Sequence, residues 1–407
     1  MPVNEHLHAA DLRGASRLAI DATVAITDLV EAMHRNISST PAILGKQPEG
    51  GAGGISGLVY RGIRGTTRLI GGGIDAALTP LIPLLRPRES TPARDAVLAA
   101  LNGVMGDHLI ETKNPLAITM QLRANGQSLV LETAALTKAL PKAGGKIAVM
   151  VHGLCMNDQQ WRRNDHDHGA ALARDLGFTP IYLRYNSGLH ISVNGREFAN
   201  RLETLVAQWP VEVSEMVILT HSMGGLVARS ALHYATAAGT RWPTLVKALV
   251  FLGTPHHGAP LERGGHWIDT ILGVSPYVAP FARLGQMRSA GITDLRHGNL
   301  LDEDWQHGDR FTRTTTRPQV LPLPANVPCY AIAATTGKQV GDLNDRLLGD
   351  GLVPVASALG HHKTKKRVLG IPPARQWIGV EMNHMDLLSS TAVYAQVRHW
   401  LAADSAA

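Results

Sequence analysis

Short, continuously apolar segments recur along the middle of the chain, and they constrain the fold more than any other feature. Five of them alternate with longer segments in which apolar residues recur at helical spacing. These five are 146–151, 180–184, 216–220, 247–252 and 329–333. A strand that is apolar on both faces is typical of a parallel sheet covered on both sides. The alternation therefore predicts an α/β fold, with a mostly parallel sheet and helices on both faces.

The part of the chain before these segments has a different pattern. Apolar residues recur at helical spacing through the first 110 residues, broken by a stretch rich in Gly, Pro and Ser at 38–54. We therefore predict an N-terminal helical segment over 1–110 and a second domain over 111–407. That domain should open with a hairpin, since strand-like segments at 117–123 and 128–132 flank an Asn-Gly turn.

Composition limits the partners. The 407 residues carry a net charge of +6, but no dense basic stripe is interleaved with aromatics, so we expect no nucleic-acid partner. The short basic cluster at 363–367 is expected to be a solvated loop. Within 55–85, arginines lie beside an apolar face. This segment is predicted either to contact a membrane surface peripherally or to pack against the catalytic domain or a second subunit.

Cysteine content and the absence of targeting signals bear on the compartment. Cys155 and Cys329 are the two cysteines, and they predict reduced thiols rather than a disulfide framework. The first residues lack the basic and then apolar pattern of a secretory signal. No run of about 18 apolar residues occurs. The sequence thus predicts a cytoplasmic protein, either soluble or peripheral at a membrane surface.

A serine directly follows the third apolar segment. The sequence Thr220-His221-Ser222-Met223-Gly224 links that segment to a helix. A serine in such a strand-to-helix turn is raised above the sheet edge beside the helix N-terminus, as in a nucleophile elbow. Thr220 stands where glycine is usual, so the alternative is an ordinary turn. We predict Ser222 as the nucleophile.

A second turn, His152-Gly153-Leu154, follows the first apolar segment. Acyl transfer needs backbone N–H groups that stabilise a negatively charged oxygen. One should come from the residue after the nucleophile, Met223, and the other from the loop after an earlier strand, at Leu154. His152 is expected to be structural.

The acid and the base should follow Ser222 in the chain. Asp350 lies in a Gly-Asp-Gly turn after the last long apolar segment and is the predicted acid, with Asp342 and Asp345 as alternatives. Four histidines follow Asp350, and three of them fit less well: His361, His362 and His399. His384 lies between a short apolar stretch and a final helix, where the base belongs, and is the predicted base.

Five motifs in this order resemble bacterial lipases and esterases of the α/β-hydrolase superfamily. They are VMVHGL at 149–154, LTHSMGGLVAR at 219–229, LGTPHHGAP at 252–260, GDGLVPVASALG at 349–360 and MNHMDLL at 382–388. The resemblance spans about 146–400 and implies an α/β-hydrolase fold, with the triad Ser222, Asp350 and His384. It implies a structural role for 254–258. In one branch of these lipases an Asp at the position of Asp386 binds calcium, but no upstream partner is clearly matched, so no metal is expected.

The resulting hypothesis is a serine hydrolase that cleaves carboxylic esters, small or lipid, through an acyl-enzyme on Ser222 and without a cofactor. An apolar insertion at about 260–311 is predicted to be a cap or lid over an acyl chain, or a helical excursion with its own small core. Two alternatives stay open. One is a lipid-surface or protein-interaction module with a vestigial site. The other is the same fold acting on an amide, thioester or polyester bond.

Overall fold

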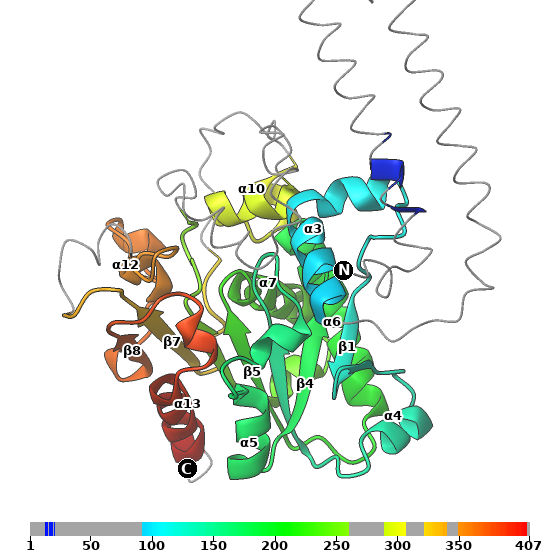
Figure 1. Cartoon of the computed structure of the whole chain (residues 1–407). Coiled ribbons are helices and arrows are strands. Elements are labelled where there is room, and N and C mark those ends of the chain that lie inside the picture. The colour runs from blue at the N-terminus through cyan, green and yellow to red at the C-terminus, as the bar shows by residue number, and fades with distance from the viewer. Residues whose placement is uncertain are drawn as a thin grey trace, which may run out of the picture. The chain divides into compact units, whose positions relative to one another are not determined.

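One sheet runs through the part of the chain that the computed structural model describes. The described residues are 92–259, 289–306, 321–339 and 349–404, with Arg13, Gly14, Ser16, Arg17, Leu18 and Ile20 near the N-terminus. The strands are β1 Gln121–Ala124, β2 Gln127–Ser128, β3 Lys146–Val151, β4 Thr179–Arg184, β5 Glu215–His221, β6 Val246–Leu252, β7 Cys329–Ala334 and β8 Gln376–Gly379. Their order across the sheet is β2-β1-β4-β3-β5-β6-β7-β8 (Figure 1).

The sheet is mostly parallel, as predicted. From β4 to β8 in that order, every neighbouring pair is parallel, whereas β1 is antiparallel to both β4 and β2. Parallel neighbours require crossover connections, which helices supply. The helices are α3 Pro92–Glu111, α4 Thr133–Ala139, α5 His168–Leu176, α6 Ile191–Gln208, α7 Gly224–Ala237, α10 Ala290–His297, α12 Val355–Ala358 and α13 Thr391–Asp404.

Helices cover both faces of the sheet. Strand side chains alternate between faces, and one set, including Met150, Leu219 and Ile332, packs against α5 and α13 (Figure 1). The opposite set packs elsewhere: Ala331 and Ala333 contact α12, while α6 and α7 pack against each other on this side. The core therefore lies on both sides of the central strands, which explains why they read as continuous apolar runs.

The hairpin is shorter than predicted. Its turn is as expected, with left-handed Asn125 and Gly126, but β2 is two exposed residues long. After Leu129, whose N–H donates to Leu122 O at 2.8 Å, the chain leaves the sheet and Val130 is exposed. The prediction of a second strand over 128–132 was wrong, because the chain beyond Leu129 pairs with no neighbouring strand at this edge of the sheet.

The described residues fall into two compact units. The first holds the described N-terminal residues and Leu109–Ala117, and the second holds Pro92–His108 and the described residues from Ile118 onward. In the first unit, Asn114 Nδ2 donates to Gly14 O at 3.1 Å, and Arg17 donates to Lys113 O at 2.9 Å. Residues 92–108 of α3 thus belong to the unit that contains the sheet.

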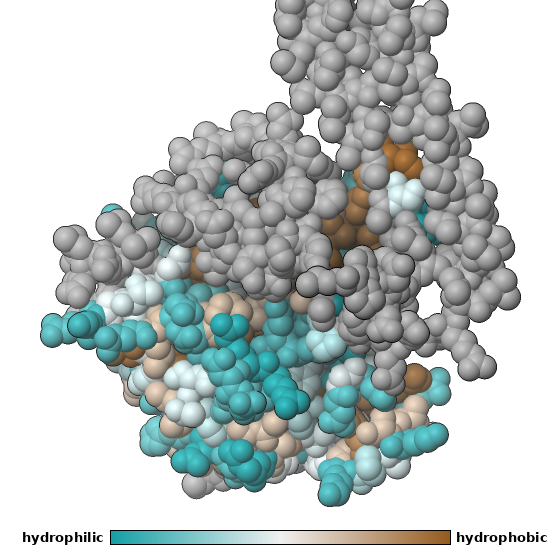
Figure 2. All heavy atoms as spheres, viewed as in Figure 1, coloured by the Kyte–Doolittle hydropathy of each residue, from teal (hydrophilic) through white to brown (hydrophobic). Residues whose placement is uncertain are grey.

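Several sequence predictions lie outside the described residues. These are the apolar segment at 55–85, most of the insertion at 260–311, and the alternative acids Asp342 and Asp345. Within the described ranges, no helix has the length and apolarity needed to cross a membrane. Cys155 and Cys329 are both free and buried. The basic cluster forms a short turn at Lys365–Arg367, in which both lysines are exposed and Arg367 is half-buried. Hydrophilic residues are spread over the described surface in Figure 2.

Candidate active site

Ser222 lies in the turn between β5 and α7. Its φ of +54° is left-handed, a conformation that costs a non-glycine residue free energy and is often found at functional sites. The Ser222 N–H donates to Leu252 O at 2.9 Å, which fixes the turn against the end of β6. A Cβ at Gly224 would lie 2.5 Å from Val151 O. The glycine is therefore required because α7 begins directly against the end of β3.

Thr220 replaces the usual glycine without disturbing this turn. Its side chain is fully buried, and its Oγ1 donates to Val250 O at 3.1 Å on the neighbouring strand β6. The hydroxyl is satisfied, so burying it carries no unpaired polar group. The hydrogen bond to β6 thus explains how threonine can stand at the position where glycine is usual.

The turn after β3 packs directly on Ser222. A Cβ at Gly153 would lie 2.9 Å from the Ser222 Cβ, so the two turns touch through backbone. The neighbouring side chains of Leu154 and Met223 are buried. Beyond them, the Cys155 N–H donates to Ser187 Oγ at 3.0 Å. The structure therefore brings the predicted oxyanion residues to the same edge of the sheet as the serine.

His152 occupies the base of this turn. Its ring stacks on Tyr185, with centroids 4.3 Å apart, and the Tyr185 hydroxyl donates to His152 O at 2.9 Å. The His152 Nδ1 donates to Gly153 O at 2.9 Å. Burial lowers the pKa of His152 to about 3, so the ring is neutral near pH 7 and holds the turn.

Helix α3 supports the same turn from outside. The Cys155 Sγ donates to Ala100 O at 3.7 Å, and a Cβ at Gly103 would lie 2.2 Å from that sulfur. In addition, Asn186 Nδ2 donates to Gly106 O at 3.0 Å. Helical periodicity placed these α3 residues in the N-terminal segment and did not predict this contact, because an apolar helix face does not reveal which surface it meets.

Asp350 and His384 form a buried pair. The His384 Nδ1 donates to Asp350 Oδ2 at 2.6 Å, and both side chains are almost fully buried. The other carboxylate oxygen of Asp350 accepts from Leu352 N at 3.0 Å and Val353 N at 2.8 Å. The His384 N–H also donates to Asp350 O at 3.0 Å. With Nδ1 donating to the carboxylate, Nε2 of a neutral His384 is left as the basic nitrogen.

The other candidate histidines lie elsewhere. His361 and His399 are exposed, and the His362 ring packs edge-on against His257, 5.0 Å away. Of the four histidines after Asp350, His384 is the one whose ring nitrogen bonds this carboxylate.

Gly253 connects the pair to the serine. It follows Leu252, whose carbonyl accepts the Ser222 N–H, and its φ is +58°. A Cβ here would lie 3.1 Å from both Cε1 and Nδ1 of His384. The imidazole therefore rests on the Gly253 backbone, beside the turn that carries Ser222. Gly253 belongs to the sequence motif at 252–260, but that motif does not reveal its contact with His384.

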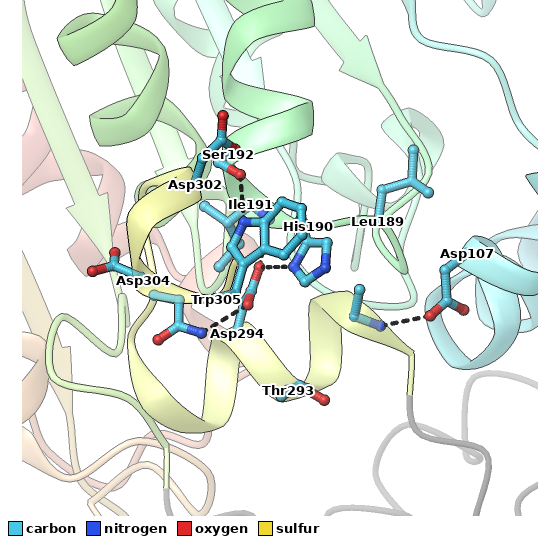
Figure 3. Close-up of polar contacts among 12 residues, drawn as sticks. Asp107, Leu189, His190, Ile191, Ser192, Thr293, Asp294, Asp302, Asp304 and Trp305 are labelled. Carbon is cyan, nitrogen blue, oxygen red and sulfur yellow. Dashed lines mark hydrogen bonds and ion pairs between the residues drawn. The ribbon is translucent and has the colours of Figure 1, made fainter. Parts of the chain in front are cut away.

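Polar contacts with α10 and Trp305 fix the end of the loop between β4 and α6 (Figure 3). Asp294 of α10 accepts from His190 Nδ1 and from Ile191 N, both at 2.9 Å, through one carboxylate oxygen. The His190 ring stacks on Trp305 with centroids 3.7 Å apart, and the Trp305 Nε1 donates to Ser192 Oγ at 3.0 Å. This fixed loop contains Ser187, whose Oγ accepts the hydrogen bond from the Cys155 N–H in the turn after β3.

Asp386 has a local role in the structure. Its Oδ2 accepts from Asn383 N at 2.9 Å, and its own N–H donates back to Asn383 Oδ1 at 3.1 Å. It thereby closes the turn around His384. Among the residues that the structure describes, no cluster of three or more His, Cys, Asp or Glu side chains could hold a metal ion.

This chain is similar to one protein family and to several solved structures. Residues 142–324 match the family model described as a PGAP1-like alpha/beta domain. The chain is similar to the mature lipase of Bacillus licheniformis, at 18% identity and a TM-score of 0.41 over 63% of this chain and 91% of that one. It is also similar to lipase B of Aspergillus fumigatus, at 13% identity and a TM-score of 0.37 over 70% and 56%. No curated protein matches. The described part of the chain thus has an α/β fold built on a mostly parallel eight-stranded sheet, and the family model covers less than half of the chain.

Proposed function

We propose that this protein is a serine hydrolase that cleaves carboxylic esters through an acyl-enzyme on Ser222. The observation that carries the proposal is the buried His384–Asp350 pair, 2.6 Å apart, at the sheet edge where Ser222 adopts its left-handed turn. A serine hydroxyl is a weak nucleophile unless a positioned base accepts its proton. The pair supplies such a base, with the tautomer that the reaction needs.

In the proposed reaction, Ser222 Oγ attacks the ester carbonyl carbon and its proton passes to His384 Nε2. Asp350 holds the imidazole and stabilises the imidazolium that forms. The Leu154 and Met223 amides donate to the carbonyl oxygen as it becomes negative, and each such donor contributes on the order of 3 kcal/mol to the transition state. The tetrahedral intermediate expels the alcohol, which leaves with the proton from His384.

Water then completes the cycle. His384 accepts a proton from a water molecule as that water attacks the acyl carbonyl. Collapse of the second tetrahedral intermediate releases the carboxylic acid and returns the proton to Ser222. The proposed reaction needs no cofactor, because the protein's own side chains supply the nucleophile and the base.

We propose small-molecule or lipid esters, with the 260–311 insertion as a cap over the acyl chain. The proposed division has an N-terminal helical segment over 1–110 and a catalytic domain over 111–407, with residues 92–108 of α3 packed in the unit that contains the sheet. A cytoplasmic location, with peripheral membrane contact through 55–85, completes the proposal.

The direct test is hydrolysis of short p-nitrophenyl esters by wild type and Ser222→Ala. We expect kcat to fall by about 10³-fold or more in the variant, since the nucleophile is lost. Ser214→Ala, an exposed serine just before β5, is the matched control and should behave as wild type. Full activity in Ser222→Ala would refute the proposal. A chain-length series of acyl esters, with amide and thioester analogues, would then distinguish the bond cleaved.

A further inference from the structure

We propose that His221 is a positioning residue, which links the main chain of the base His384 to the turn that carries Ser222. The inference rests on the proposed function and deepens it, by assigning a role to the residue before the nucleophile. Its basis is a hydrogen bond between residues 163 positions apart in the chain. Nothing in the local sequence reveals that contact.

The bond fixes the protonation of the His221 ring. Its Nε2 lies 3.0 Å from the main-chain oxygen of His384. A carbonyl oxygen can only accept a hydrogen bond, so Nε2 must carry the proton. Burial lowers the pKa of His221 well below its ordinary value, which keeps the ring neutral. Nδ1 therefore bears a lone pair and the imidazole has one orientation.

Three hydrogen bonds hold His384, and they differ in origin. Asp350 supplies two of them, through its main-chain oxygen and its carboxylate. The third comes from His221 to the His384 carbonyl. Of the three, this bond alone reaches the chain segment that carries Ser222. It therefore ties the main chain of the base to the turn that carries Ser222, which the two bonds from Asp350 do not.

The neutral state of His221 also matters for the proposed reaction. Its ring centroid lies 4.5 Å from that of His384, and His384 becomes a cation during catalysis. A charged neighbour at that distance would oppose this step. The His221 Nδ1 is buried without a hydrogen-bond partner and faces Gly153, where a Cβ would lie 3.2 Å away. His221 thus fills the space between base and oxyanion turn without adding charge.

A second buried histidine provides a matched comparison. The His168 Nε2 donates to Leu387 O at 2.9 Å, in the same loop as His384. Its Nδ1 lies 2.8 Å from Nε2 of His166. Burial lowers the pKa of His168 to about 4. The two histidines make the same kind of bond to the segment at 384–387, but His168 lies on α5 and not in the turn that carries Ser222.

The experiment compares His221→Leu, His221→Gln and His168→Leu in the full chain. Leucine removes the donor and keeps the volume, whereas the glutamine amide restores an N–H near Nε2. We expect His221→Leu to lower kcat by about 10- to 100-fold with KM nearly unchanged, because small misplacement of a reacting group has effects of this size. His221→Gln should recover most of kcat. His168→Leu should lower the melting temperature comparably but change kcat less than about threefold.

A second readout does not depend on turnover. The proton in the 2.6 Å bond between His384 and Asp350 should give a low-field NMR resonance, assigned by its loss in His384→Gln. We expect it in wild type, His221→Gln and His168→Leu, but broadened or lost in His221→Leu. Retention of this resonance and of kcat in His221→Leu would overturn the inference, as would equal losses of kcat in His168→Leu. If the resonance follows this pattern but wild type cleaves no ester, the proposed function alone fails.

Discussion

Gly253 shows how a single residue position controls the geometry of the candidate site. Its left-handed φ already disfavours other residues. A Cβ there would also lie 2.8 Å from Leu387 Cδ1 and 3.1 Å from the His384 ring. The backbone at this point therefore serves as the surface on which the imidazole rests.

We predict that Gly253→Ala lowers kcat by about 10- to 100-fold, because the added methyl displaces His384 from Ser222. Unfolding should become easier by about 1–3 kcal/mol, owing to the left-handed backbone. Steady-state kinetics and urea unfolding measure the two effects. Gly144→Ala is the control, since a Cβ there meets nothing closer than 4.0 Å. Wild-type kcat in Gly253→Ala would show that His384 does not rest on this glycine.

At the scale of elements, α3 is joined to the sheet by buried charges. Asp95 of α3 lies 2.7 Å from Arg184 of β4, and Arg123 of β1 lies 2.9 Å from Asp158. Burial raises the pKa of Asp158, and the two arginines oppose that shift. Breaking a buried pair costs far more than the pair contributes, because one charge is left without its partner.

We therefore predict that Asp95→Ala lowers the free energy of unfolding by about 3–5 kcal/mol. Removal of the exposed Glu197–Arg201 pair on α6, 3.0 Å apart, should cost only about 0.3–0.5 kcal/mol. Chemical denaturation of Asp95→Ala and Glu197→Ala measures the contrast. Equal, small effects would mean that α3 is not an integral part of the sheet-containing unit.

Sequence patterns predicted the elements better than their partners. The parallel strands, Ser222 and the Asp350–His384 candidates were accessible because buried strands are continuously apolar and their carboxyl ends meet at one edge. The contact of α3 with the turn at 152–155 could not be predicted from the sequence, because one apolar helix face fits many surfaces. The His221–His384 bond was equally hidden, since it depends on how two distant loops pack. The second hairpin strand failed because strand propensity does not guarantee a neighbour.

At the scale of the whole molecule, buried neutral histidines make the fold sensitive to acid. Burial lowers the pKa of His152 to about 3 and of His168 to about 4. It also lowers the pKa values of His221 and His256 well below the ordinary value. Between about pH 6.5 and 4 the unfolded chain therefore binds more protons than the folded chain. Linkage then requires stability to fall as the pH falls through this window.

We predict that the free energy of unfolding falls by about 1.4 kcal/mol per pH unit below pH 6.5 for each such histidine. Urea unfolding at pH 7.5, 6.0 and 5.0 measures the slope. In His168→Gln one titrating group is gone, so the slope should be shallower by about that amount. A stability that is level from pH 7.5 to 5.0 would contradict the burial of these rings as neutral groups.

The central claim is that Ser222 is a nucleophile activated by His384 and Asp350. The most direct measurement is intact-protein and peptide mass spectrometry after reaction with a fluorophosphonate. We predict one added phosphonyl group, on Ser222, in wild type and in Ser214→Ala. Labelling should be absent from Ser222→Ala and much slower in His384→Gln. Labelling of another residue, or equal labelling of Ser222→Ala, would contradict the account.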